Sequence, residues 1–297
     1  YYCCSFRITV VVSPSCTAVT FVQLMDQFRT LILKCDPETR VAHLLLNRPA
    51  QRNALSHQFF TEFPAALAAI DLNQDVNVVV ISGVGDHFCS GIDLTSLSSI
   101  TKNGSGDQAR TNEQLRRHIL FLQEAITAVE KCRKPVIVAI NGCCIGGGVD
   151  LITACDLRYC SRDAFFSVKE VDLGITADLG TLQRLPGIVG YGKSVELALT
   201  GRQFSSQEAK DMGLVSSIFE TKNALDEGVR LLATGMAEKS PLAVTGTKSV
   251  LLKGRDMSIS QSLDYVATWN SAMLLSDDLK EAISALLQKR KPVFAKL

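Results

Sequence analysis

The feature that most constrains the fold is a pair of continuous apolar segments that each end in glycine, VNVVVISG at residues 76–83 and PVIVAING at residues 135–142. Strands that do not alternate apolar and polar residues are typical of a sheet with both faces covered. Between them, RRHILFLQEAITAVEKC at residues 116–132 has the apolar spacing of a helix. Buried strands that alternate with helices predict an α/β fold.

Other segments extend this prediction. LILKC and VAHLLLNRP, on either side of the turn DPET, predict paired strands, and LSHQFFTEFPAALAAID at residues 55–71 predicts a helix. The polar, glycine-containing stretch at residues 98–112 predicts a surface loop, with a mobile flap as the alternative. From about Ser205 to the end, the pattern is mostly helical.

Composition excludes several classes of protein. The 297 residues include 31 basic and 30 acidic side chains, a net charge of +1, so we expect no nucleic-acid partner. No run of about 18 uncharged apolar residues occurs, and we expect no membrane span. The ten cysteines include no C-x-x-C pair, which favours reduced thiols in the core over disulfides, and we expect no metal site.

The two ends of the sequence differ in character from the rest. Residues 1–24 contain one Arg and no acidic residue, and they lack the small-residue cleavage site of a signal peptide. We expect residues 1–24 to be a non-native or disordered extension, 25–204 the core, and 205–297 a C-terminal helical region. The tripeptide Ala295-Lys296-Leu297 resembles the S-K-L address that a peroxisomal import receptor reads, which predicts a peroxisomal location.

Two glycine-rich corners follow the apolar strands. Gly146-Gly147-Gly148 open a helix, where unpaired N–H groups and the positive end of the helix dipole favour an anion or a developing oxyanion. The alternative is tight packing of the helix on a strand. The second corner runs through Ser90–Asp93. Together, the two corners could direct two N–H donors at one carbonyl oxygen, which is the geometry of an oxyanion hole.

The stretch VKEVDLGITADLG at residues 168–180 places Glu170, Asp172 and Asp178 among apolar neighbours. A buried carboxylate is costly unless it is paired or used. The alternative is that these acids face water or cap a helix.

Four segments together resemble the enoyl-CoA hydratase/isomerase (crotonase) superfamily, and most closely its Δ3,5-Δ2,4-dienoyl-CoA isomerase branch. The likeness runs from about Leu31 to the last residue. The segments are NRPAQRNAL (47–55), HFCSGIDL (87–94), KPVIVAINGCCIGGGVDLITACDLRYCS (134–161) and AFFSVKEVDLGITADLGTLQRLPGIVG (164–190).

The resemblance implies a crotonase-like spiral of β-β-α turns, followed by helices that build a homotrimer or, from paired trimers, a homohexamer. It implies an acyl-CoA thioester as substrate and no cofactor, because coenzyme A is part of the substrate. The implied oxyanion donors are the N–H groups of Ile92 and Gly147. The implied thioester and CoA contacts are Cys89, Ser90, Gly91, Ile92 and Asp93, and Arg52, Asn53, Ala54 and Leu55.

The resemblance also implies roles for the acids. A 3,5-dienoyl thioester becomes a 2,4-dienoyl thioester by losing a proton at C2 and gaining one at C6, and we assign these steps to Glu170 and Asp178. Asp150 is expected to support them, and Asp172 is expected to be structural. The lysine that many hydratases use for the CoA phosphates is absent after the first corner, or shifted to Lys102.

Three alternatives remain for the function. An enoyl-CoA hydratase would have Glu at position 150 and no acid at position 178, and a Δ3-Δ2-enoyl-CoA isomerase would use one acid. A non-catalytic acyl-CoA binding protein could lose Glu170 or Asp178 without penalty.

Overall fold

The computed structural model describes residues 28–95 and 107–297. The extension predicted at residues 1–24 and the cation Lys102 lie outside these ranges. Within them, no helix is both long enough and apolar enough to cross a membrane.

Six strands form the main sheet, and the first two make the antiparallel hairpin that the sequence predicts. The remaining neighbours are parallel. In spatial order the strands are β1 (Leu31–Asp36), β2 (Val41–Leu46), β3 (Val78–Gly83), β4 (Val136–Ile140), β6 (Leu157–Ser161) and β9 (Ser217–Phe219).

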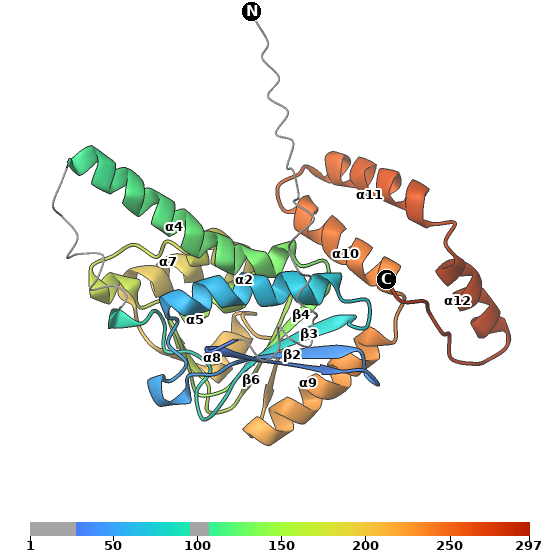
Figure 1. Cartoon of the computed structure of the whole chain (residues 1–297), viewed down its shortest axis with the longest axis horizontal. Coiled ribbons are helices and arrows are strands. Elements are labelled where there is room, and N and C mark those ends of the chain that lie inside the picture. Colours follow the sequence, from blue (N-terminus) through green and yellow to red (C-terminus); the bar gives the residue numbers. More distant parts are fainter. Residues whose placement is uncertain (1–27, 96–106) are drawn as a thin grey trace, which may run out of the picture.

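Helices cover both faces of this sheet, as the unbroken apolar strands predict (Figure 1). In β3, Val79 and Ile81 belong to the large core, which also contains side chains of α2 (His57–Leu72) and α4 (Gln108–Lys131). Val78 and Val80 point the other way and pack against α9 (Lys222–Ala237). The α/β class predicted from the sequence is therefore confirmed.

A second, three-stranded sheet consists of β5 (Cys143–Ile145), β7 (Phe165–Ser167) and β8 (Phe204–Ser205). The chain passes from β4 into β5, and from β6 into β7, and so moves between the two sheets in turn. Gly142 makes the first of these bends at φ +57°, where a Cβ atom would lie 2.2 Å from the Asp86 carbonyl oxygen. These alternating passages form the predicted spiral of β-β-α turns.

One prediction about an individual segment needs correction. Residues 108–112, predicted as loop, are the first turn of α4, because the Asp107 carboxylate caps the helix by accepting from the Ala109 N–H at 2.9 Å. The region after Ser205 is mostly helical, as the sequence predicts. It also contains the short strand β9, which joins the main sheet beside β6.

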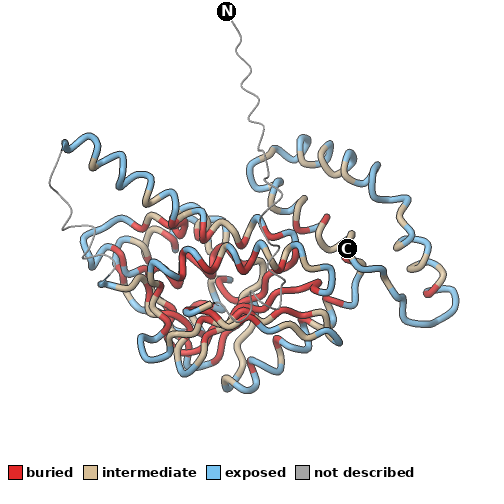
Figure 2. The backbone as a smooth tube through the Cα atoms, in the orientation of Figure 1, coloured by how far each residue is buried: buried red, intermediate tan, exposed pale blue. Residues whose placement is uncertain are grey.

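Helices α6 (Thr181–Val189) and α7 (Tyr191–Thr200) connect β7 to β8, and α8 (Ser206–Asp211) lies between β8 and β9. The chain ends in an arm of three helices, α10 (Pro241–Gly254), α11 (Ile259–Met273) and α12 (Asp277–Leu287). Figure 2 shows that this arm is far more exposed than the sheets, and α11 has no buried residue.

Candidate active site

The two glycine corners lie side by side because a short parallel bridge joins them. The Cys89 N–H donates to the Cys143 carbonyl at 2.9 Å, and the Ile145 N–H donates to the Cys89 carbonyl at 3.0 Å. Residues 84–94, which follow β3, are thereby fixed against β5, which leads into the glycine triplet. The bridge brings together two corners that are more than 50 residues apart in the sequence.

The backbone on either side of Ile92 pairs with Leu55. The Leu55 N–H donates to the Gly91 carbonyl at 2.8 Å, and the Asp93 N–H donates to the Leu55 carbonyl at 2.9 Å. In extended backbone, successive N–H groups point to opposite sides, so the Ile92 N–H points away from Leu55. Among the described residues it has no hydrogen-bond acceptor, and the same holds for the Gly147 N–H at the start of the helix.

These two free donors lie close together. A Cβ atom built on Gly147 would lie 3.6 Å from the Ile92 nitrogen, and one built on Gly91 would lie 3.8 Å from the Gly147 nitrogen. Two adjacent N–H groups without protein acceptors can bind one oxygen atom that carries negative charge.

Glycine is needed at each position of the triplet for a different structural reason. Gly146 adopts φ +51° and ψ −118°, a conformation that is nearly restricted to glycine. Gly148 packs against Cys89, since a Cβ atom there would lie 3.0 Å from the Cys89 Cβ. The packing interpretation therefore applies to Gly148, while Gly147 offers the free donor. These residues begin α5 (Gly147–Ala154), in which every residue is buried.

A cavity of about 200 Å³ lies between the corners and the stretch that carries the acids. It brings together seven of the predicted site residues, which are Ser90, Gly91, Ile92, Gly147, Asp150, Glu170 and Asp178. The rest of its lining is mostly apolar and includes Leu94, Ile145, Leu173, Ile175 and Leu179. Such a cavity suits an acyl chain that ends in a polar, reactive group.

Glu170 lies against the oxyanion corner. It begins the 3₁₀ helix Glu170–Leu173 and is 8% exposed, and its Oε1 lies 3.3 Å from a Cβ atom built on Gly146. Its Oε2 is buried with no partner among the described residues. Burial, followed by the nearby Asp150 charge, raises the pKa of Glu170 to about 7. A carboxylate with this pKa can accept a proton near neutral pH.

Asp178 is half-buried, and burial raises the pKa of its carboxyl above the ordinary value. Asp150 is 1% exposed on α5, and its Oδ1 accepts from the Thr181 N–H at 2.7 Å. Burial raises the pKa of Asp150 to about 6 despite that hydrogen bond. Asp150 thus holds the start of α6 in place and adds negative charge close to Glu170.

Asp150→Asn is expected to shift the pH dependence of turnover. The Asp150 charge raises the pKa of Glu170, so its removal lowers that pKa and leaves Glu170 ionised at lower pH. The acid limb of kcat/KM against pH should therefore move to lower pH. Asp172→Asn is the control, because Asp172 is exposed and paired with Lys169. An acid limb that stays in place, or moves upward, would contradict this account.

Two predicted thioester contacts lie outside the cavity. Cys89 is fully buried, its Sγ accepts from the Gly91 N–H at 3.4 Å, and burial raises the pKa of its thiol to about 12. Asp93 is held by Arg48, with 2.8 Å between Oδ2 and Nη2, and it also accepts from Thr95. Both side chains therefore stabilise the corner and are turned away from the cavity.

The predicted CoA-binding segment also contains structural residues. Asn53 is buried and donates to the Val84 and His87 carbonyls at 3.0 and 2.8 Å. Leu55 is buried against Gly147, and Ala54 is partly buried. Arg52 is exposed, in a left-handed conformation with φ +48°, which leaves it as the accessible cation of the segment.

Sequence reasoning did not identify Leu94, Ile145 or Lys169 as lining residues. Lys169 directly precedes Glu170 in the stretch at residues 168–180 that drew attention to the acids, so its position in the sequence was an available signal. As for metals, no cluster of three His, Cys, Asp or Glu side chains in the described ranges could hold an ion.

Comparisons with known proteins agree on one family. The model of the enoyl-CoA hydratase/isomerase family matches residues 36–296. A protein of Arabidopsis thaliana, named peroxisomal Delta(3,5)-Delta(2,4)-dienoyl-CoA isomerase, is 64% identical over 92% of this chain and 99% of its own length. A protein of Mus musculus with the mitochondrial form of that name is 47% identical over 85% of this chain and 78% of its own.

Solved structures give the same result. The crystal structure of an enoyl-CoA hydratase from Bacillus anthracis superposes with a TM-score of 0.81 at 30% identity, covering 90% of this chain and 99% of that one. This match confirms the predicted fold class.

Proposed function

The chain belongs to the enoyl-CoA hydratase/isomerase family, and on that premise we propose that it converts 3,5-dienoyl-CoA thioesters into 2,4-dienoyl-CoA thioesters in fatty-acid β-oxidation. The observation that carries this proposal is one cavity in which Glu170, Asp178 and Asp150 lie beside the free N–H groups of Ile92 and Gly147. The relatives from Arabidopsis thaliana and Mus musculus, which bear the name of this activity, support it.

The reaction needs a base at C2, an acid at C6 and donors for the thioester oxygen. The Ile92 and Gly147 N–H groups bind that oxygen and stabilise the negative charge of the dienolate. Ionised Glu170 removes the C2 proton, and protonated Asp178 delivers a proton to C6. Afterwards Glu170 carries the proton and Asp178 is ionised, and exchange with solvent restores both. No electrons are transferred, so the proposed reaction requires no cofactor beyond the CoA of the substrate.

The positions of the two acids support this division of labour. Glu170 lies against the oxyanion corner, through Gly146, and C2 is the carbon next to the thioester carbonyl. Asp178 lies beside α4, since its backbone carbonyl accepts from Gln123. We therefore assign C2 to the acid that lies against the corner, and the carbon farther along the acyl chain to the acid beside α4.

A spectroscopic assay tests the proposal against its alternatives. With a 3,5-dienoyl-CoA, we expect growth of the ultraviolet absorbance of the conjugated 2,4-dienoyl product. With a 2-enoyl-CoA, we expect little loss of the enoyl absorbance. Hydration of the 2-enoyl substrate without isomerisation would favour a hydratase, isomerisation of a 3-enoyl substrate alone would favour a Δ3-Δ2 isomerase, and no reaction at all would favour a binding protein.

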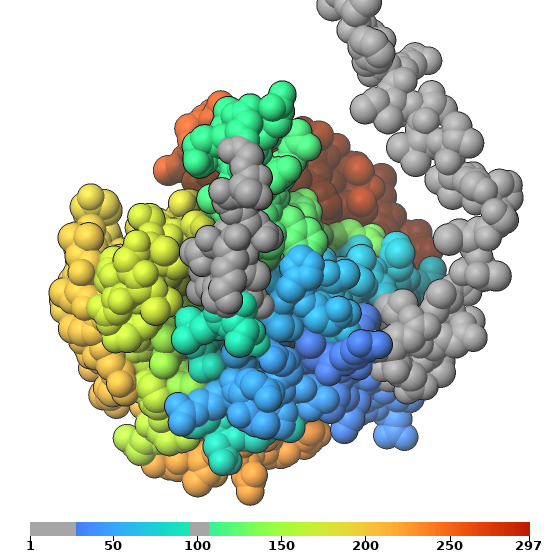
Figure 3. Space-filling view, turned by 60° about the vertical axis from the view of Figure 1, so that its left-hand side comes forward, coloured from blue at the N-terminus to red at the C-terminus, as the bar shows by residue number. Residues whose placement is uncertain are grey.

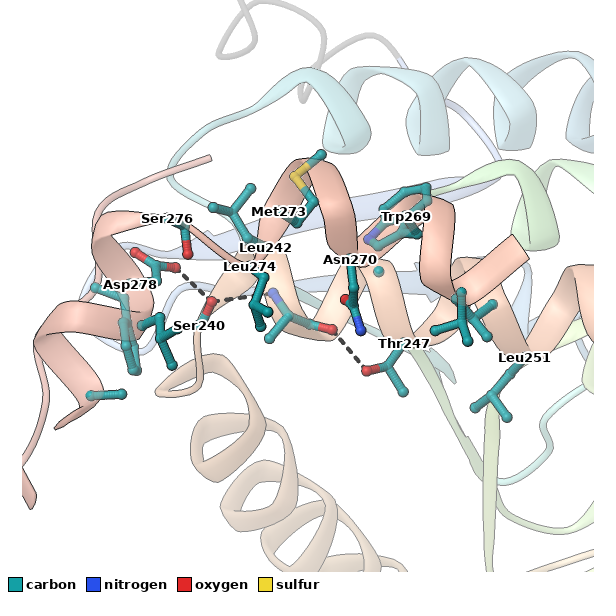
Figure 4. A pocket seen from close by; sticks show the side chains of 17 residues that line it. Ser240, Leu242, Thr247, Leu251, Trp269, Asn270, Met273, Leu274, Ser276 and Asp278 are labelled. Atoms are coloured by element: carbon teal, nitrogen blue, oxygen red, sulfur yellow. Dashed lines mark hydrogen bonds between the residues drawn. The ribbon is translucent and has the colours of Figure 1, made fainter. Parts of the chain in front are cut away.

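We also propose that the C-terminal arm assembles a homotrimer or homohexamer. Helices α10, α11 and α12 surround a hollow of about 430 Å³ that is mostly apolar, with Trp269, Met273 and Leu274 on its wall (Figure 4). Apolar side chains of α11 and of the turn that follows it are exposed, and Leu275 is 86% exposed. An uncovered apolar surface of this kind is typical of an interface between subunits.

Leu275→Glu is expected to shift the native mass towards the single chain, because it places a charge in this surface. Sedimentation measures the change, and Leu72→Glu, at an exposed leucine that ends α2, is the control. A parent protein that sediments as a single chain would refute the assembly.

The location that we propose is the peroxisome, with the import receptor as partner. Its support is the tripeptide Ala295-Lys296-Leu297 and the peroxisomal name of the Arabidopsis thaliana relative. Deleting Leu297 should leave the enzyme active and send an N-terminal fluorescent fusion to the cytosol. A fusion that the deletion leaves in place, or one found in mitochondria, the compartment in the name of the Mus musculus relative, would contradict this location.

A further inference from the structure

We propose that Gln123, in the middle of α4, is a positioning residue that fixes Asp178 for proton delivery at C6. The inference rests on the proposed function, because it concerns one of the two proton-transfer steps. Gln123 does not line the cavity with the acids. It acts on the backbone that carries the acid.

The contact is direct and has no substitute among the described residues. The Gln123 side-chain amide donates from Nε2 to the Asp178 backbone carbonyl at 2.6 Å, across 55 residues of sequence. No other donor in ranges 28–95 and 107–297 reaches that oxygen. Gln123 is partly buried, so water does not freely replace its amide.

Gln123 belongs to a face of α4 that contacts both Asp178 and helix α6. Residues 123, 127 and 130 lie on one side of α4 by helical spacing. The Thr127 hydroxyl and the Glu130 carboxylate both accept from Arg184 Nη2 on α6, at 3.2 and 2.7 Å. Helix α4 therefore contacts the chain both at Asp178 and one turn into α6.

Other contacts hold the residues around Asp178 but do not reach its backbone carbonyl. Thr181 is anchored to Asp150, and the neighbours Ala177 and Leu179 are buried. These contacts fix where the segment lies. Gln123 holds the Asp178 carbonyl, whose carbon is bonded to the Cα atom from which the carboxyl group projects, so this contact restrains the point from which the acid reaches into the cavity.

Glu170 does not depend on this contact. It stands on the 3₁₀ helix beside Gly146, on a different element from the segment that Gln123 holds. Loss of the Gln123 amide should therefore disturb the C6 step and spare the C2 step. A merely structural role would weaken both steps together, which makes the ratio of the two rates a specific readout.

Helix α4 crosses the body above α2 and then projects from it at its N-terminal end (Figures 1 and 3). The half that contains Gln123 lies over the core, where Leu122 and Ile126 are buried. The positioning contact therefore comes from the anchored part of the helix.

The test compares Gln123→Met, which keeps the length of the side chain and removes the donor, with Gln114→Met, an exposed glutamine on the same helix. Isomerisation of a 3,5-dienoyl-CoA and exchange of the C2 proton with heavy water are measured for the parent and both variants. We expect Gln123→Met to lower kcat for isomerisation by about 10- to 100-fold, the order of effect of a misplacement near 1 Å. KM and C2 exchange should stay close to the parent values, and Gln114→Met should match the parent.

Each outcome bears on one proposal. An unchanged rate in Gln123→Met, or an equal loss of exchange and isomerisation in a folded variant, would overturn the positioning role. A parent that exchanges or isomerises nothing would instead overturn the proposed function. If Gln123→Met does not fold, Gln123→Ala removes the same donor with the residue most favourable to helices, and the same ratio decides.

Discussion

Asp178→Asn is expected to slow isomerisation by roughly 10²–10⁴-fold, the effect of losing a positioned acid, while the C2 proton still exchanges with heavy water. The amide cannot deliver a proton to C6. Glu170 remains in place, because it stands on its own 3₁₀ helix against Gly146, and the dienolate still forms. The dienolate then returns to substrate and takes up deuterium at C2.

Glu170→Gln is expected to abolish both processes, because no base remains to form the dienolate. The raised pKa values of Glu170 and Asp178 support these separate roles, since burial brings both carboxyl groups closer to the pH at which they exchange protons. Both substitutions keep the volume of the side chain, so a difference in rates between the two variants reflects the loss of an ionisable group.

Mass spectrometry of recovered substrate and the absorbance of product measure the two processes side by side. Asp172→Asn is the matched control, because this exposed acid stands in the same stretch and is paired with Lys169. If Asp178→Asn abolishes exchange while Glu170→Gln retains it, the two roles are reversed. If both variants isomerise at the parent rate, the carboxylates are structural and the isomerase proposal fails.

The sequence predicts those parts of the fold in which a local residue pattern follows from a general physical rule. β3 is uncharged because both of its faces are covered, so its first four residues alone predict a sheet between two layers. The glycine triplet predicts free N–H groups for a similar reason, since the first donors of any helix lack partners.

Other features depended on contacts between distant residues. Nothing local distinguishes Cys89 from its neighbour Ser90, yet Cys89 packs behind Gly148 while Ser90 lines the cavity. The position of Asp93 in the sequence predicts a site residue, but its carboxylate pairs with Arg48, which is 45 residues earlier. The assignment of 108–112 to a loop failed because the polar composition of the segment outweighed the cap at Asp107.

The acids also combine features that the sequence predicts with features that depend on contacts between distant residues. A stretch of apolar residues around Glu170 and Asp178 is visible in the sequence, and it predicts carboxyl groups with raised pKa values. The hydrogen bond from Thr181 to Asp150, which separates the supporting acid from the other two, joins residues 31 positions apart and has no local signal.

Gly147→Ala is expected to raise the barrier to isomerisation by about 2–4 kcal/mol while the protein remains folded. The added methyl group would lie 3.6 Å from the Ile92 nitrogen, in the space that the thioester oxygen must enter to reach both donors. It would also lie 3.2 Å from Leu55 Cδ1, at the end of a side chain that can shift by a few tenths of an ångström. The free energy of unfolding should therefore change little.

The measurements are kcat, the melting temperature and the native mass. Gly187→Ala is the control, because a methyl group there would meet no atom within 4 Å and should leave all three unchanged. Leu55→Val in the Gly147→Ala background separates the two explanations for a loss, since it removes the atom that the new methyl group touches. Recovery of activity in that double variant would attribute the loss to packing against Leu55. If the loss persists, the methyl group acts where the Ile92 and Gly147 donors converge, because its next nearest neighbours are the Ile92 nitrogen at 3.6 Å and the Gly91 carbonyl carbon at 3.8 Å.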